Sequence, residues 1–160
     1  MKNRSFFNAG ENRFRVVFEN AAVGIARVSP VGRFLEVNQR LCGILGYTRE
    51  ELLTKTFADI TYPDDLGKDW KQWQELLGSE IENFSVEKRY CRKDGSNLWV
   101  NLTVSLMHRA DGSPDYYTSV VEDISARKQT QEKLRDSEER LRLALRAAGL
   151  GRSSGSSATA

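Results

Sequence analysis

The feature that most constrains the fold is a strict alternation of side-chain type through residues 98–107. One set of alternate positions is aliphatic throughout: Leu98, Val100, Leu102, Val104 and Leu106. A period of two places these side chains on one face of a β-strand. The opposite face is only partly polar, with Trp99, Asn101, Thr103, Ser105 and Met107. We therefore expect one face to pack against helices and the second to meet a partner.

Two further strands flank this one, so that three antiparallel strands follow one another. Residues 84–93 and 116–124 show the same period of two. Asp-Gly turns at 94–95 and 111–112 separate them from the middle strand.

An earlier hairpin adds two strands at 24–29 and 34–38, around a turn with Pro30 and Gly32. The order is two strands, several short helices and three strands. This order predicts an α+β fold, in which a five-stranded antiparallel sheet carries the helices across its concave side.

Helical periods and end signals mark the remaining elements. Helices are expected at 14–21, 39–45, 48–53 and 63–77. Asn38 can cap the second, Thr48 and Glu51 form a capping box for the third, and Pro63 suits a first helical position. The fourth carries the strongest apolar stripe, made of Leu66, Trp70, Trp73 and Leu77.

Composition excludes several functional classes. The chain of 160 residues has 24 basic and 22 acidic residues and a net charge of +2, which is no footprint for nucleic acid. No apolar run approaches the length of a membrane span, so a soluble, cytoplasmic protein without membrane contact is expected. Cys42 and Cys91 are isolated and His108 is the single histidine, so no disulfide or zinc site is expected.

The last strand passes directly into a long charged segment. Leu134, Leu141 and Leu145 follow heptad spacing, continued by Ala148 and interrupted by Glu138. A single helix with such a narrow apolar stripe is marginal in water. We expect a two-stranded coiled coil between two copies, and the alternative is a solvated monomeric helix.

Ordered motifs from Glu11 to Ser125 resemble a PAS domain with its C-terminal PAC segment, also called a sensory box. They are FENAAVGI at 18–25, VN at 37–38, LGYTREELL at 45–53, YPDDL at 62–66, EKRY at 87–90, RKDG at 92–95, WV at 99–100 and VEDIS at 121–125. The resemblance implies a sensory or interaction module of a multidomain bacterial signalling protein. In that family the sheet passes a signal into a C-terminal helix, which drives a histidine kinase or a cyclic-dinucleotide enzyme.

An internal repeat suggests that a second such domain begins near residue 138. RFRVVFENAAVG at 13–24 aligns without gaps with RLRLALRAAGLG at 140–151. The arginines, the apolar positions, one alanine and the glycine are preserved. The predicted organisation is a lead-in helix at 1–22, a PAS/PAC domain at 23–125, a signalling helix at 126–148, and a flexible tail at 149–160 whose composition is common in engineered chain ends.

The sequence lacks the residues through which cofactor-binding PAS domains hold a flavin or a haem covalently or as ligands. TFADIT at 56–61 replaces the motif that carries the reactive cysteine of light-sensing relatives, and Cys42 lies on an earlier helix. Haem-binding relatives use a histidine on the long helix, where residues 66–77 have none, and His108 reads as an exposed residue at a strand end. No cofactor is therefore assigned. A noncovalent flavin stacked on Trp70 or Trp73 remains an alternative to their placement in the core or at its rim.

Strand parity singles out one lysine. If Val100 and Leu102 face inward, the neighbouring strand points Lys88 toward the helices. A buried ammonium needs a carboxylate or an anionic ligand, unless it reaches the rim. We favour the rim, with Lys88, Tyr90 and Trp70 at the edge of a small-molecule cavity.

The exit motif Asp123-Ile124-Ser125 is the predicted transmission site. Asp123 resembles the family aspartate that ties the last strand to basic groups, for which Arg92 and Lys93 are candidates, and Asp123 or Ser125 could also cap the helix. No phosphate loop or nucleophile with an acid-base pair occurs, so this segment is not expected to be an enzyme. We predict a sensory and dimerisation module beside other PAS and output domains. The alternatives are a ligand-free spacer and a flavin redox sensor.

Overall fold

The structure is a computed structural model that describes residues 2–149, with side chains described at residue 10 and from residue 12 onward. It divides into two units, Met1–Ile124 and Ser125–Ala160, which are treated separately below. Apart from Gly149, the predicted tail at 149–160 lies outside the described residues.

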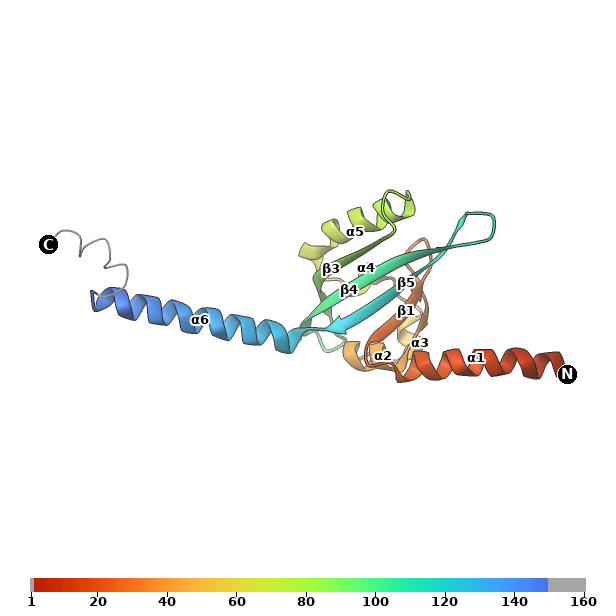
Figure 1. The fold of residues 1–160 in the computed structure, drawn as a ribbon, viewed down its shortest axis with the longest axis horizontal. Coiled ribbons are helices and arrows are strands. Elements are labelled where there is room, and N and C mark those ends of the chain that lie inside the picture. Colours follow the sequence, from red (N-terminus) through yellow and green to blue (C-terminus); the bar gives the residue numbers. More distant parts are fainter. Residues whose placement is uncertain (1, 150–160) are drawn as a thin grey trace. The chain divides into compact units, whose positions relative to one another are not determined.

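The first unit contains five helices and five strands in its described part (Figure 1). The helices are α1 (Lys2–Asn20), α2 (Gln39–Leu45), α3 (Arg49–Leu52), α4 (Phe57–Ile60) and α5 (Pro63–Leu77). The strands are β1 (Gly24–Val28), β2 (Phe34–Val37), β3 (Asn83–Cys91), β4 (Asn97–His108) and β5 (Pro114–Asp123). The second unit contains α6 (Ser125–Ala147).

The five strands form one antiparallel sheet in the order β2-β1-β5-β4-β3. The predicted α+β fold, with a five-stranded sheet and helices between its second and third strands, is confirmed. Because β1 and β4 both pair with β5, the strand that leads to α6 lies in the centre of the sheet. Like β1 and β4, it is hydrogen-bonded along both edges, so it is held by a neighbour on each side.

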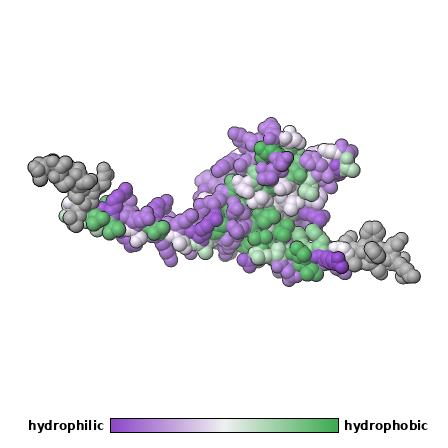
Figure 2. Space-filling view, viewed as in Figure 1, coloured by the Kyte–Doolittle hydropathy of each residue, from purple (hydrophilic) through white to green (hydrophobic). Residues whose placement is uncertain are grey.

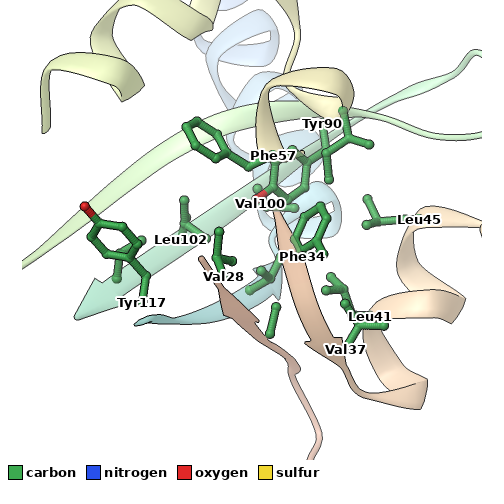
Figure 3. Packing of buried hydrophobic residues seen from close by; sticks show 14 of the residues in the cluster. Val28, Phe34, Val37, Leu41, Leu45, Phe57, Tyr90, Val100, Leu102 and Tyr117 are labelled. Carbon is green, nitrogen blue, oxygen red and sulfur yellow. The ribbon is translucent and has the colours of Figure 1, made fainter. Parts of the chain in front are cut away.

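The core lies between one face of the sheet and the short helices. The alternating side chains of β4 are buried as predicted, and Val100, Leu102 and Val104 are fully enclosed. Figure 3 shows Leu41 and Leu45 from α2 and Phe57 from α4 among the sheet residues of this cluster. Burial of this apolar surface is the main force that holds the helices on the sheet.

The helix ends match the sequence signals. Asn38 caps α2 by accepting from the Leu41 amide, and Gly46 ends that helix in the left-handed region. Thr48 and Glu51 form the predicted capping box of α3. Pro63 stands in the first turn of α5. These local contacts satisfy amides that a helix leaves unpaired at its start.

Helix α5 is rotated relative to its apolar stripe. Asp69, Trp73 and Leu76 are its buried residues, whereas Trp70 and Leu77 are exposed. The helix predicted at 63–77 is present. Its predicted inner face was wrong, because Trp70 and Leu77 of the apolar stripe are exposed. The cause is polar, since Asp69 turns inward to meet a buried lysine on β3.

Helix α6 has no buried residue. Its surface is mainly hydrophilic, with isolated apolar positions (Figure 2). The exposed apolar side chains are Leu134, Leu141, Leu143 and Leu145. Among the described residues, no helix is long and apolar enough to cross a bilayer.

Candidate functional site

The most unusual feature of the core is a lysine inside it. Strand β3 turns Phe84, Val86, Lys88 and Tyr90 inward, as the parity argument predicted. Lys88 is 1% exposed, so it does not reach the rim. The preference for a rim position was wrong, because the parity argument alone could not show that a carboxylate stood opposite.

That carboxylate belongs to Asp69 on α5. The Lys88 ammonium donates to Asp69 Oδ2 and, at 3.2 Å, to the Thr61 hydroxyl. Trp73 Nε1 donates to Asp69 Oδ1 at 3.1 Å, so both carboxylate oxygens are bound. The Thr61 hydroxyl in turn donates to the Phe57 carbonyl at 2.7 Å. Every charged atom of the pair thus has a partner, which an ion pair removed from water requires.

Burial also shifts the pKa of two groups in the site. Desolvation lowers the pKa of Lys88, while the charge of Asp69 and its hydrogen bond act in the opposite direction. The rings of Tyr90 and Phe57 lie 4.8 and 5.4 Å from the ammonium, within the range of cation-π attraction. Burial raises the pKa of Tyr90 well above its ordinary value.

A second ion pair joins the same two elements on the outer side. Asp65, one turn before Asp69, accepts from the Arg89 amide at 2.8 Å and from its Nε and a terminal nitrogen at 3.0 and 2.9 Å. The hydrogen bonds from Arg89 lower the pKa of Asp65. Since Lys88 and Arg89 are neighbours, α5 is bound to one point of β3 by two carboxylates.

Aromatic rings occupy the space between α5 and the middle of the sheet. Trp73 stacks on Phe57 with centroids 4.4 Å apart and meets Tyr117 edge-on at 4.3 Å. Trp70 contacts Phe57 from the exposed side at 5.4 Å. One face of the Trp73 indole is thus covered by Phe57, and a flavin stacked there would have to displace that ring.

The exit from the sheet leaves no loop. β5 ends at Asp123 and α6 begins at Ser125, with only Ile124 between them. Ile124 is buried, and its amide donates to the Trp99 carbonyl on β4 at 3.0 Å. The junction is therefore anchored by a side chain and by a backbone bond at the last residue before the helix.

Cross-strand register connects this exit with the buried pair. Lys88 pairs with Val100 on β4, and Val100 pairs with Asp123 on β5. The next row holds Arg89, Trp99 and, through its amide bond, Ile124. Adjacent strands are about 4.8 Å apart, so the two ends of the first row are separated by about 10 Å.

The structure brings some predicted site residues together and not others. Lys88 and Trp70 both lie beside Phe57, but only Trp70 is at the surface. The rim position predicted for Tyr90 was wrong too, since strand β3 turns this side chain into the core, where it is 2% exposed. Lys93 pairs with Glu51 at 2.8 Å, and a bond between Asp123 and Arg92 stays a prediction.

The remaining chemical candidates lie outside this cluster. His108 is exposed at the last position of β4, as expected. Cys42 is a buried free thiol and Cys91 a half-buried one. Within the described residues, no group of three or more histidine, cysteine or acidic side chains could hold a metal ion.

Asp69 is the important residue that sequence reasoning missed. One signal could have identified it, because it stands three residues after Leu66 and four before Trp73 and so shares their helix face. Combined with an inward Lys88, this position would have suggested the pair.

Comparison with known proteins identifies the class of domain. The family model described as the PAS fold matches residues 34–121. The chain belongs to this family, and the expected resemblance is confirmed.

The relatives are signalling proteins. The chain is 40% identical over 148 residues to the probable diguanylate cyclase DgcE of Escherichia coli (strain K12), covering 92% of the chain and 13% of the relative. It is 33% identical over 143 residues to the sensor histidine kinase TmoS of Ectopseudomonas mendocina, covering 89% of the chain and 15% of the relative. The chain is thus a PAS sensor domain homologous to small parts of longer signal-transduction proteins.

Solved structures agree on the fold. The PAS domain of an HTR-like protein from Haloarcula marismortui superposes with a TM-score of 0.66 at 23% identity, covering 77% of this chain and 98% of that one. A domain of a sensory box sensor histidine kinase/response regulator from Geobacter sulfurreducens gives a TM-score of 0.60 at 27% identity, covering 71% of this chain and 94% of that one.

Proposed function

We propose that this PAS domain relays a change in the packing of α5 to the exit helix α6, and that it does so within a longer histidine kinase or diguanylate cyclase. The observation that carries the proposal is the row Lys88, Val100, Asp123. One end of this row holds the ion pair to α5, and the other is the last strand residue before the helix.

The input acts on the contact between α5 and β3. A ligand, a change of redox state or a bound partner that favours another position of α5 must alter the bonds of Asp69 and Asp65 to β3. A buried ammonium that loses its carboxylate must take up another anion or water, or give up its proton. The contact therefore favours two discrete arrangements over a gradual displacement, and a ligand that prefers one arrangement shifts their populations.

The output acts through α6. Because β5 is central and Ile124 is anchored to β4, a shift of β3 and β4 changes the direction in which the first turn of α6 starts. We propose that Asp123, Ile124 and Ser125 transmit this change. Two copies of α6 pair through Leu134, Leu141 and Leu145, whose side chains are exposed in the described chain.

A ligand-free spacer is the second candidate function, and the aromatic packing favours it. Phe57, Trp73 and Tyr117 are each at most 3% exposed, with Trp73 stacked on Phe57 and edge-on to Tyr117, and Lys88 already has a carboxylate partner. A domain of this kind would hold its partners at a fixed separation without a ligand. Native mass spectrometry and an absorption spectrum of the purified protein distinguish the two functions and also test for a flavin.

The relay is tested by perturbing one end of the row and observing the other. In the double variant Lys88→Met and Asp69→Leu, the pair is replaced by apolar side chains of similar size. The proposal predicts that amide hydrogen exchange changes at residues 123–130, measured by mass spectrometry or NMR.

A matched control lies on the outer face of the same strand. Ser85 bonds only across to Thr103 at 3.0 Å, so Ser85→Ala changes β3 without touching the pair. Exchange at residues 123–130 that is altered equally by both variants, or by neither, contradicts the relay.

A further inference from the structure

The end of α1 docks on the domain through a small set of contacts. Phe18 is 3% exposed, whereas Phe14, one turn earlier, is 46% exposed. The buried Asn38 side chain donates to the Phe18 carbonyl at 2.7 Å and to the Val23 carbonyl at 3.0 Å. Its Oδ1 accepts from the Ile25 amide at 2.9 Å. One apolar side chain and one amide thus fix the end of the helix and the start of β1.

The chain after this helix needs a glycine. A Cβ on Gly24 would lie 2.9 Å from Leu41 Cδ1 and 3.2 Å from Leu41 Cα. Real side chains do not approach this closely, and the backbone of α2 cannot move aside without disturbing the cap at Asn38. The docked segment is therefore recognised by an apolar residue at position 18 and a glycine six residues later.

Residues 140–151 repeat this pattern at the end of α6. Leu145 aligns with Phe18, Leu141 with Phe14, and Gly151 with Gly24. The match includes the two arginines of each copy and Glu11 with Glu138. In the described chain Leu145 is exposed, although its counterpart Phe18 is buried.

We propose that the last two turns of α6 are a docking segment for the core of a second domain of this same fold, with Leu145 in the position that Phe18 takes here. The occupant is a PAS-type core that presents an asparagine like Asn38 and a leucine like Leu41. This inference is independent of the relay, since it concerns what α6 binds and not how it is moved.

The charge of Arg146 restricts which PAS core can receive α6. The Glu19 carboxylate accepts from Arg49 at 2.7 Å and from the Gln39 amide at 2.9 Å. The end of α1 thus contacts the core through an acidic side chain. Arg146 stands at the matching place in α6. The core that receives α6 therefore carries an acidic or neutral acceptor in place of Arg49, and this difference disfavours docking onto the chain's own core.

The same helix can still pair with a second copy. In α1, Phe14 stacks on the docked Phe18 and is still 46% exposed. Leu141, the counterpart of Phe14, therefore keeps an exposed side for a helix partner while Leu145 enters a core.

A segment exchange in the intact chain tests the docking pattern. Residues 13–23 are replaced by the sequence of residues 140–150, with Glu19 retained to keep its bond to Arg49. The control receives residues 127–137 of the same helix, again with Glu19 retained, which places a glutamate at position 18. We expect the exchange to melt within about 5 °C of the unchanged protein and the control to melt at least about 10 °C lower. Protection of the Ile25 amide from hydrogen exchange should follow the same order.

A single substitution covers the case in which the exchanged segment prevents folding. Phe18→Leu introduces the residue found at position 145, and Phe18→Asn is its control. The inference requires Phe18→Leu to retain most of the protection of amides 16–20 and Phe18→Asn to lose it. It is overturned if Phe18→Leu exposes these amides as fully as Phe18→Asn does, or if the exchange variant folds and its Ile25 amide is no better protected than in the control.

Discussion

Lys88 on β3 and Asp123 on β5 occupy one cross-strand row, because Val100 on β4 pairs with both. Lys88 is held by α5 through Asp69, and Asp123 is two residues from the start of α6. One row of paired strand residues thus runs from the contact with α5 to the end of β5, just before α6 begins.

The buried pair gives the first prediction. Lys88→Met leaves Asp69 as an unpaired buried charge, and Asp69→Leu does the same to Lys88. Each single variant should lower the free energy of unfolding by about 3–5 kcal/mol, while the double variant should recover most of this loss. Urea unfolding followed by tryptophan fluorescence measures all four proteins. Additive effects would show that the two groups do not depend on each other.

Acid should weaken the ion pair between Asp65 and Arg89. The pKa of Asp65 is lower in the folded chain than in the unfolded chain because Arg89 bonds its carboxylate. The stability from this contact is complete above the unfolded pKa of about 4 and is lost as the pH falls through the folded pKa. Asp65→Asn should therefore reduce the decrease in unfolding free energy between pH 6 and pH 3. Asp64→Asn, which changes the same charge without removing a bond to Arg89, should leave the decrease nearly unchanged.

Two glycines should respond to alanine in opposite directions. Gly24→Ala forces a methyl group against Leu41 and should cost about 1–3 kcal/mol. Gly43→Ala lies within α2 with no atom within 4 Å of the added carbon, and it should stabilise by about 0.5–1 kcal/mol. Thermal unfolding measures both. A stabilising Gly24→Ala would mean that α2 and β1 are farther apart than described.

The exit aspartate should matter more for regulation than for folding. Asp123 is exposed at the end of β5, so Asp123→Ala should change the melting temperature by only a few degrees. In the full-length protein, the same variant should alter how strongly the output activity responds to its signal. Equal loss of stability and of regulation would contradict a role in transmission.

The leucines of α6 provide a test of pairing. Leu134→Lys with Leu141→Lys places charges in the proposed seam and should shift the mass in solution from dimer to monomer, as measured by analytical ultracentrifugation. Leu143→Lys is the control, because Leu143 is also exposed but lies outside the heptad positions. A monomer before any substitution would leave α6 as a solvated helix.

The sequence by itself determined the order of the elements and the inward faces of the strands. A period of two through residues 98–107 admits only one pleated arrangement, and local signals such as the capping box at Thr48 act over a few residues and need no distant partner. Resemblance to known motifs then identified the family.

Only the tertiary structure decided how α5 is turned and where the charge of Lys88 is neutralised. Asp69 and Trp70 are adjacent in the sequence, and apolar spacing alone would choose the tryptophan for the interior. Asp69 lies inside because a buried ammonium on β3 requires an anion, and that requirement exists only when the helix packs on the sheet. Hydrophobic periodicity is a property of one segment, whereas the desolvation of a charge depends on everything that surrounds it.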